Sequence, residues 1–251
     1  MQSTHVDIQT PDGVANAYLT RPDDQPHPGV LLLMDAFGVR PTIEEMADRI
    51  AADGYVVLAP NVFYRAGRSP IPPMPDMSDS EGRTRFFQSL RPLMDELTPE
   101  RLDRDGSAYL DYLAEAAGPG PVAITGYCMG ARLGWRIATA HPDRVAALGG
   151  FHAGGLVTDA PDSPHRSASE LKAELYFGFA DQDPSMNAEQ IATLEQALED
   201  AGVRYSAEVY ESAQHGYTME DTPAFNEEAR ERHYRELRSL LERTLGAGVA
   251  H

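Results

Sequence analysis

Short, continuous apolar runs alternate with longer amphipathic stretches along most of the chain. Continuous apolar runs are typical of parallel strands buried on both faces, and the amphipathic stretches between them are typical of crossover helices. The first two runs flank Pro11-Asp12-Gly13, a turn in which proline presets φ and glycine allows a positive φ, so they predict an antiparallel hairpin at a sheet edge. The expected strands cover residues 6–9, 15–20, 29–34, 55–59, 122–125, 145–149, 175–179 and 205–210.

Capping residues mark the helix starts between these strands. Thr42 with Glu45 three residues later predicts a capping box, and Thr98-Pro99-Glu100 combines an N-cap, a first-turn proline and an acidic residue. Further helices are expected over residues 131–140 and 223–245. No internal repeat or composition shift divides the chain, so we expect one α/β domain over residues 1–251, with a mostly parallel, twisted sheet of about eight strands and helices on both faces.

The segment 61–81 is unusually long for a connection inside one domain and contains Pro70, Pro72, Pro73 and Pro75. Loops of this length are usually functional or disordered. It follows the carboxyl end of a strand, where ligands bind in open α/β sheets. An active-site flap and a plain surface loop are therefore both open interpretations.

Composition narrows the class of protein. The 251 residues include 39 acidic and 21 basic side chains, for a formal charge of −18, and a single cysteine. One cysteine excludes an internal disulfide, and no run has the roughly 18 apolar residues of a membrane span or the pattern of a signal peptide. The negative charge disfavours nucleic acid and anionic membranes as partners. We therefore expect a cytoplasmic protein acting on a small molecule.

The single cysteine lies in Gly126-Tyr127-Cys128-Met129-Gly130, between an expected strand and an expected helix. This is the G-x-C-x-G form of the nucleophile elbow, a tight turn whose flanking glycines avoid clashes with neighbouring backbone. A lone cysteine is more often a small buried hydrophobe. Here the two glycines and the strand-to-helix context favour a catalytic thiol at Cys128.

A catalytic thiol needs a base and a group that orients the base, in the chain order nucleophile, acid, histidine. His215 follows the last expected strand, and Asp181 follows the strand before it. Asp183 is an alternative to Asp181, because it lies in the same loop. His152, which also follows a strand, is a weaker candidate at the border of the site. The sequence has no metal-ligand spacing and no glycine-rich phosphate loop, so no cofactor is expected.

The elbow motif, Asp181, Ala213-Gln214-His215-Gly216-Tyr217 and Asp35-Ala36-Phe37-Gly38-Val39 together resemble the dienelactone hydrolase family of the α/β-hydrolase fold. The resemblance extends over nearly the whole chain. It implies a triad of Cys128, His215 and Asp181. It also implies an oxyanion hole formed by the backbone N–H groups of Ala36 and Met129.

Two positions depart from the family pattern. Asp35 replaces a glutamate that the resemblance implies holds the thiol proton until substrate arrives, and its side chain is one carbon shorter. Met219 replaces one of two arginines that would hold a substrate carboxylate. The second arginine is expected to correspond to Arg83, with Arg85 and Arg40 as alternatives.

The expected chemistry is hydrolysis of an enol-lactone or activated carboxylic ester through a thioester on Cys128. A thiolate at a helix N-terminus beside an imidazole is a strong nucleophile, but a simple alkoxide leaves less readily than the thiolate does. Alternatives are acyl transfer or thioester cleavage at the same thiol, or a catalytically idle binding protein. The oligomeric state is left open between a monomer and a homodimer. Aromatic residues near strand ends, Phe37, Tyr64, Tyr127 and Phe151, are expected to line the pocket.

Overall fold

The chain folds around one eight-stranded sheet with the strand order β1-β2-β4-β3-β5-β6-β7-β8. The computed structural model describes residues 1–70, 79–118 and 120–246, without the side chains of Ser80 and Arg83. All eight predicted strands are confirmed, and they are β1 (Gln2–Thr10), β2 (Gly13–Arg21), β3 (Gly29–Leu33), β4 (Val56–Pro60), β5 (Val122–Tyr127), β6 (Val145–Phe151), β7 (Glu174–Ala180) and β8 (Tyr205–Tyr210).

The sheet is antiparallel only at its N-terminal edge. Strand β1 pairs with β2 as the predicted hairpin, and β2 pairs antiparallel with β4. Every other neighbouring pair is parallel. The residues of β3, β4 and β5 are all buried, as expected for strands covered on both faces.

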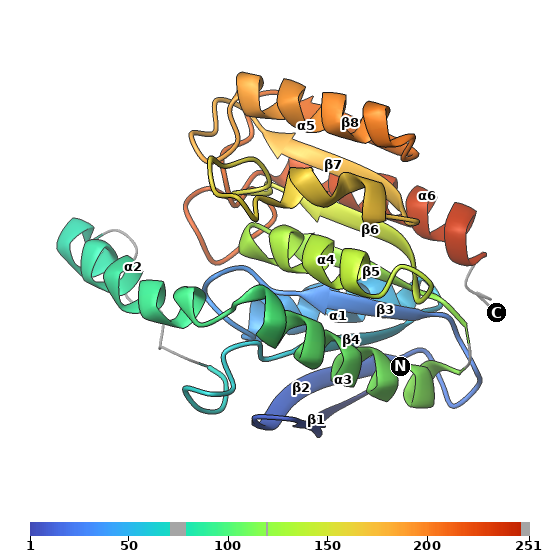
Figure 1. Ribbon diagram of the computed structural model, residues 1–251. Helices are drawn as coiled ribbons and strands as arrows, with labels where there is room; N and C mark the ends of the chain where they lie inside the picture. The colour runs from blue at the N-terminus through green and yellow to red at the C-terminus, as the bar shows by residue number, and fades with distance from the viewer. Residues whose placement is uncertain (71–78, 119, 247–251) are drawn as a thin grey trace.

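Helices lie on both faces of the sheet (Figure 1). One face is covered by α1 and α6, and the other by α3, α4 and α5. These helices are α1 (Pro41–Ala52), α3 (Pro99–Ala117), α4 (Met129–Ala140), α5 (Ala188–Ala201) and α6 (Glu227–Leu245), and a 3-10 helix η1 (Pro164–Glu170) precedes β7. The predicted α/β fold class is therefore confirmed.

The capping predictions have mixed outcomes. Helix α3 begins at Pro99 with the Thr98 side chain accepting from the N–H of Arg101, as predicted. The capping box at Thr42 is wrong, because proline takes the first helical position at Pro41 and Arg40 becomes an N-cap without a side-chain bond. Helix α6 begins four residues later than predicted, because the Asn226 side chain caps it.

Helix α2 (Ser80–Asp95) extends beyond the layered body of the molecule (Figure 1). Within segment 61–81, residues 61–64 are buried and residues 80–81 begin α2. Residues 71–78, where the proposed flap would lie, are outside the described part of the chain. The described part of α2 packs Phe86 and Leu90 against Ala36, beside the end of β3.

The parallel strands bring their carboxyl ends to one edge of the sheet. Cys128 follows β5, the Asp181–Asp183 turn follows β7, and His215 lies in the loop after β8. Since β5, β6, β7 and β8 are consecutive parallel neighbours, these three loops meet above the same edge.

Candidate active site

Cys128 occupies a strained turn between β5 and α4. Its backbone adopts φ 54° and ψ −115°, a conformation that non-glycine residues rarely take. A Cβ on Gly126 would overlap the backbone of Gly130, and a Cβ on Gly130 would overlap the carbonyl of Leu33. Both glycines are therefore required by close backbone packing, and the turn places Cys128 directly before the first residue of α4.

His215 links the thiol to a buried carboxylate. Its Nε2 lies 3.0 Å from the Cys128 Sγ, and its Nδ1 lies 2.5 Å from Oδ2 of Asp183. The Asp183 Oδ1 accepts two further hydrogen bonds, from the Ser185 N–H at 2.8 Å and the Ser185 hydroxyl at 2.7 Å. The carboxylate is only 4% exposed, so these bonds fix both its position and that of the imidazole.

The expectation that Asp181 orients His215 is wrong, because Asp183 makes that contact. Gln182, between the two carboxylates, adopts a left-handed conformation with φ 51°, and the chain turns there. The Asp181 carboxylate instead accepts the N–H of Ser212 at 3.1 Å, which ties the loop after β7 to the loop after β8. Asp183, the alternative named from the sequence, is the residue that the fold places on the histidine.

The hydrogen bonds of His215 strongly favour its protonated form. Burial alone would favour the neutral imidazole, but the bonds to Asp183 and Cys128 outweigh it and raise the pKa of His215 to about 10. Burial would raise the pKa of Asp183, yet the bonds from His215 and Ser185 hold that pKa below its ordinary value. The arrangement is suited to a carboxylate beside an imidazolium at neutral pH.

The thiol and imidazole open onto a cavity of about 270 Å³. Residues from four loops and from α2 line it, and they include Ala36, Phe37, Phe87 and Met219. Phe37 thus lies where the sequence predicted. Ala36, after β3, faces the same cavity as Cys128, and Met129 is the first residue of α4. Among the described backbone hydrogen bonds outside helices and strands, neither N–H is a donor.

Asp35 lies in the cavity wall but is held by Arg40. The Arg40 guanidinium contacts both Asp35 oxygens, at 2.7 Å and 3.0 Å, and the N–H of Phe37 donates to the same carboxylate at 3.0 Å. Arg40 also binds Asp221, with its Nε 2.5 Å from Oδ2. The expected contact of Asp35 with the thiol is not among the hydrogen bonds of the described residues, and Arg40 takes its place.

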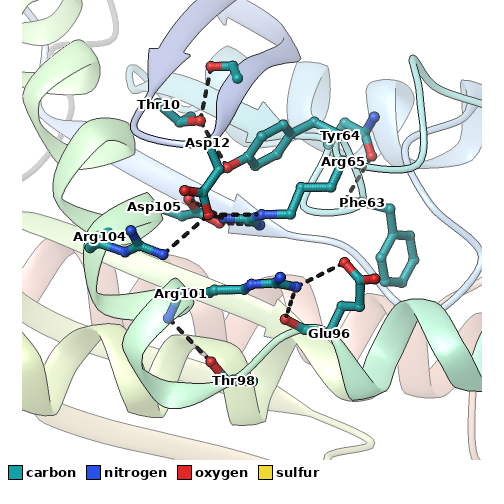
Figure 2. Close-up of polar contacts among 12 residues, drawn as sticks. Thr10, Asp12, Phe63, Tyr64, Arg65, Glu96, Thr98, Arg101, Arg104 and Asp105 are labelled. Atoms are coloured by element: carbon teal, nitrogen blue, oxygen red, sulfur yellow. Dashed lines mark hydrogen bonds and ion pairs between the residues drawn. The ribbon is translucent and has the colours of Figure 1, made fainter.

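Tyr64 lies away from the cavity, contrary to expectation. Its hydroxyl donates to Asp105 at 2.8 Å and accepts from Thr10 at 2.8 Å, between the first hairpin and α3 (Figure 2). Arg65 stacks over the Tyr64 ring and bridges Asp105 to Asp12. These contacts tie down the chain after β4, so Tyr64 is a packing residue.

Tyr127 and Phe151 are also packing residues. Both are fully buried, and their rings stack with centroids 5.8 Å apart. The Tyr127 hydroxyl lies 2.9 Å from Nε2 of His233 in α6. Neither residue is part of the cavity lining, because the strand ends turn both side chains into the layer beneath α6.

The expected arginine clamp is absent from the described cavity lining. Met219, at the position where the family resemblance implies an arginine, lies in the lining and is 1% exposed. Arg85 is exposed and pairs with Glu81, and Arg40 is neutralised by two carboxylates. The side chain of Arg83 lies outside the described residues, so its role stays a prediction.

Sequence reasoning missed two residues at the site, Ser185 and Phe87. Ser185 fixes Asp183, and the spacing Asp-Pro-Ser, typical of an Asx turn, is the local signal for it. Phe87 reaches the cavity from α2, and no local signal indicates this. His152, which the sequence placed at the border of the site, lines the cavity. Its ring centroid lies 5.4 Å from that of His215, and its Nε2 lies 2.8 Å from the Thr218 hydroxyl.

The described residues give no sign of a metal or a membrane segment. No group of three or more potential ligands among them is placed to hold a metal ion. No helix in the described ranges combines the length and apolarity of a bilayer span.

Comparisons with known proteins identify the family of the chain. Residues 15–245 match the model of the dienelactone hydrolase family. The "Putative carboxymethylenebutenolidase" of Yersinia pestis is 29% identical over 224 residues, covering 85% of this chain and 78% of the relative. The "Carboxymethylenebutenolidase homolog" of Mus musculus is 29% identical over 203 residues, covering 80% and 75%.

Solved structures show the same fold. The crystal structure of a "Putative Dienelactone Hydrolase" from Klebsiella pneumoniae superposes with a TM-score of 0.82 at 23% identity, covering 95% of this chain and 97% of that one. The family match spans nearly the whole chain, from the second strand to the last helix. The chain therefore belongs to the dienelactone hydrolase family and is a carboxylic ester or lactone hydrolase with the α/β-hydrolase fold.

Proposed function

We propose that the protein hydrolyses enol-lactones or activated carboxylic esters with Cys128 as the nucleophile and a thioester as the intermediate. The observation that carries the proposal is the continuous chain of contacts from Sγ to Nε2 at 3.0 Å and from Nδ1 to Asp183 at 2.5 Å. This is the relation of nucleophile, base and orienting acid that acyl transfer requires.

The first half of the reaction forms the thioester. The Cys128 thiolate attacks the carbonyl carbon, a C–S bond forms, and the carbonyl electron pair moves onto oxygen. In this mechanism the N–H groups of Ala36 and Met129 donate to that oxyanion, at about 3 kcal/mol each. When the C–O bond breaks, the departing oxygen takes the proton from His215 Nε2, and an enolate leaves more readily than an alkoxide.

The second half returns the enzyme to its starting state. The neutral His215 accepts a proton from water as the water oxygen attacks the thioester carbonyl. Collapse of this second intermediate breaks the C–S bond and restores the thiolate beside the imidazolium. The acid product ionises, so one water is consumed and one carboxylate, one alcohol or enol and one proton are released. Asp183 keeps Nδ1 protonated throughout and stabilises the imidazolium.

Activity of two variants tests the proposal. Cys128→Ala and His215→Gln are each expected to lower kcat/KM on p-nitrophenyl acetate by at least about 10³-fold. His141→Gln is the matched control, because His141 lies at the far end of α4 against Asp103, and its activity should stay within about twofold. Undiminished hydrolysis by Cys128→Ala would remove Cys128 from the mechanism. Release of the acyl group mainly to an added thiol, in place of water, would assign acyl transfer.

A further inference from the structure

The wall of the cavity around Cys128 is mainly apolar. On one side, Phe37 and Phe87 lie with ring centroids 5.7 Å apart, and Phe86 packs behind them at 5.5 Å and 6.2 Å. On the other side, Met219 comes from the loop between β8 and α6, where Pro223 and Ala224 continue the surface. Phe87 keeps 46% of its surface exposed, although large aromatic side chains are usually buried.

Two of the charged groups next to this wall are already paired, Arg40 and His215. Arg40 lies behind Asp35 and divides its guanidinium between Asp35 and Asp221, so this cluster carries a net negative charge. Burial alone would lower the pKa of Arg40, but the two carboxylates outweigh it and raise that pKa, so the guanidinium stays charged and occupied. His215 is similarly held between Cys128 and Asp183.

No arginine or lysine is part of the described cavity lining. Arg132, one turn after Cys128 in α4, packs its Cδ beside Gly155 and interacts electrostatically with Cys128, but it is not among the lining residues. Among the described lining residues, a carboxylate on the substrate would therefore meet an apolar wall and the Asp35 carboxylate. Transfer of an unpaired carboxylate into such a site is strongly unfavourable.

We propose that this site selects uncharged acyl groups with a small aromatic or short aliphatic body, and discriminates against esters and lactones that carry a carboxylate. The acyl group would lie against Phe37 and Phe87 while its carbonyl faces Cys128. The volume of about 270 Å³ lies just below the usual range for small-molecule pockets, about 300–1,000 Å³, which suits a single ring or a short chain. The inference rests on the proposed function, since it names the substrate class of the same thiol.

A matched pair of esters tests the selectivity. p-Nitrophenyl butyrate and mono-p-nitrophenyl succinate have the same leaving group and acyl length, and differ in a terminal methyl against a carboxylate. With rates corrected for all hydrolysis without enzyme, which for the succinate includes attack by its own carboxylate, we expect the wild-type kcat/KM to be at least about tenfold higher for the butyrate. Equal or faster turnover of the succinate would overturn the inference, and loss of that turnover in Arg83→Ala or Arg132→Ala would identify the cation responsible.

A second variant tests the wall directly. Phe87→Arg places a cation at the cavity and should raise the succinate-to-butyrate ratio at least about fivefold. Val209→Arg is the matched control, because Val209 is 48% exposed on β8 and lies outside this cavity. It adds the same charge to the protein and should leave the ratio unchanged. An equal rise in both variants would assign the effect to net charge and contradict the inference. If Cys128→Ala hydrolyses both esters normally, the proposed function itself fails, which is a separate result.

Discussion

Oδ2 of Asp183 lies 2.5 Å from Nδ1 of His215, whereas the carboxylate of Asp181, two residues earlier, accepts the N–H of Ser212. The two aspartates therefore have different tasks, although they share one loop. Asp183 positions the imidazole and stabilises its protonated form, whereas Asp181 joins two loops.

Asparagine substitutions separate these tasks. Asp183→Asn is expected to lower kcat/KM by about 10²–10⁴-fold, because a neutral amide neither stabilises the imidazolium nor fixes its tautomer. Asp181→Asn should change kcat/KM by less than about threefold, since its amide oxygen can still accept the Ser212 N–H. Steady-state kinetics of both variants on one activated ester measures the contrast. The reverse order of effects would restore Asp181 as the orienting acid.

The elbow glycines make a stability prediction. Gly130→Ala is expected to cost at least about 4 kcal/mol of unfolding free energy, or to prevent folding, because its Cβ would overlap the Leu33 carbonyl. Gly202→Ala is the control: Gly202 has φ 67° but open space around it, so only the backbone cost of about 1–2 kcal/mol applies. Urea unfolding measures both. Similar losses of unfolding free energy in the two variants would show that close packing at the elbow does not contribute to the cost of Gly130→Ala.

The cluster in Figure 2 makes a second stability prediction. Arg65→Met should destabilise the protein by about 3 kcal/mol, because it leaves the carboxylate of Asp105, which is 1% exposed, without its cation. Adding Asp105→Asn should recover part of that loss. Arg85→Met removes an exposed arginine of α2 and should stay within about 0.5 kcal/mol. A loss in Arg65→Met as small as in Arg85→Met would refute the role given to this cluster.

His233 predicts how stability depends on acid. Burial lowers the pKa of His233 to about 3, below the ordinary value of 6.5. The unfolded chain therefore binds a proton that the folded chain does not, and stability falls as pH decreases from 6.5 toward 3, by about 1.4 kcal/mol per pH unit for this group. His233→Gln should make that decline shallower, whatever its effect at neutral pH. Urea unfolding between pH 4 and pH 7 measures the slope, and an unchanged slope would contradict the prediction.

Local patterns were sufficient for the strands and for the elbow, because both are set by nearby residues. The strand runs, the hairpin turn and the glycines around Cys128 need no knowledge of distant parts of the chain. His215 could be identified because it lies in the loop after residues 205–210, which the apolar pattern had already predicted to form a strand. The α/β fold class could be predicted for the same reason, whereas the α/β-hydrolase fold was implied by the resemblance to the dienelactone hydrolase family.

The predictions that were wrong concern residues whose contacts depend on a backbone angle or on a distant part of the chain. The choice between Asp181 and Asp183 depends on the left-handed turn at Gln182, which no residue pattern marks. Tyr64 was expected at the pocket because it follows a strand, but its partner Asp105 lies in α3, on another part of the chain. Asp35 was expected near the thiol, and its contacts are set by Arg40 together with the distant Asp221.

The central claim is that the acyl group passes through Cys128, and trapping the intermediate tests it most directly. The protein is mixed with excess p-nitrophenyl butyrate, quenched in acid within the first turnovers, and analysed by intact mass and peptide mapping. Cys128 is the only cysteine, so a thioester has one possible position. We predict one butyryl group per chain on the peptide containing Cys128, removable by neutral hydroxylamine and absent in Cys128→Ala. A butyryl group on another residue, during turnover that Cys128→Ala retains, would contradict the account.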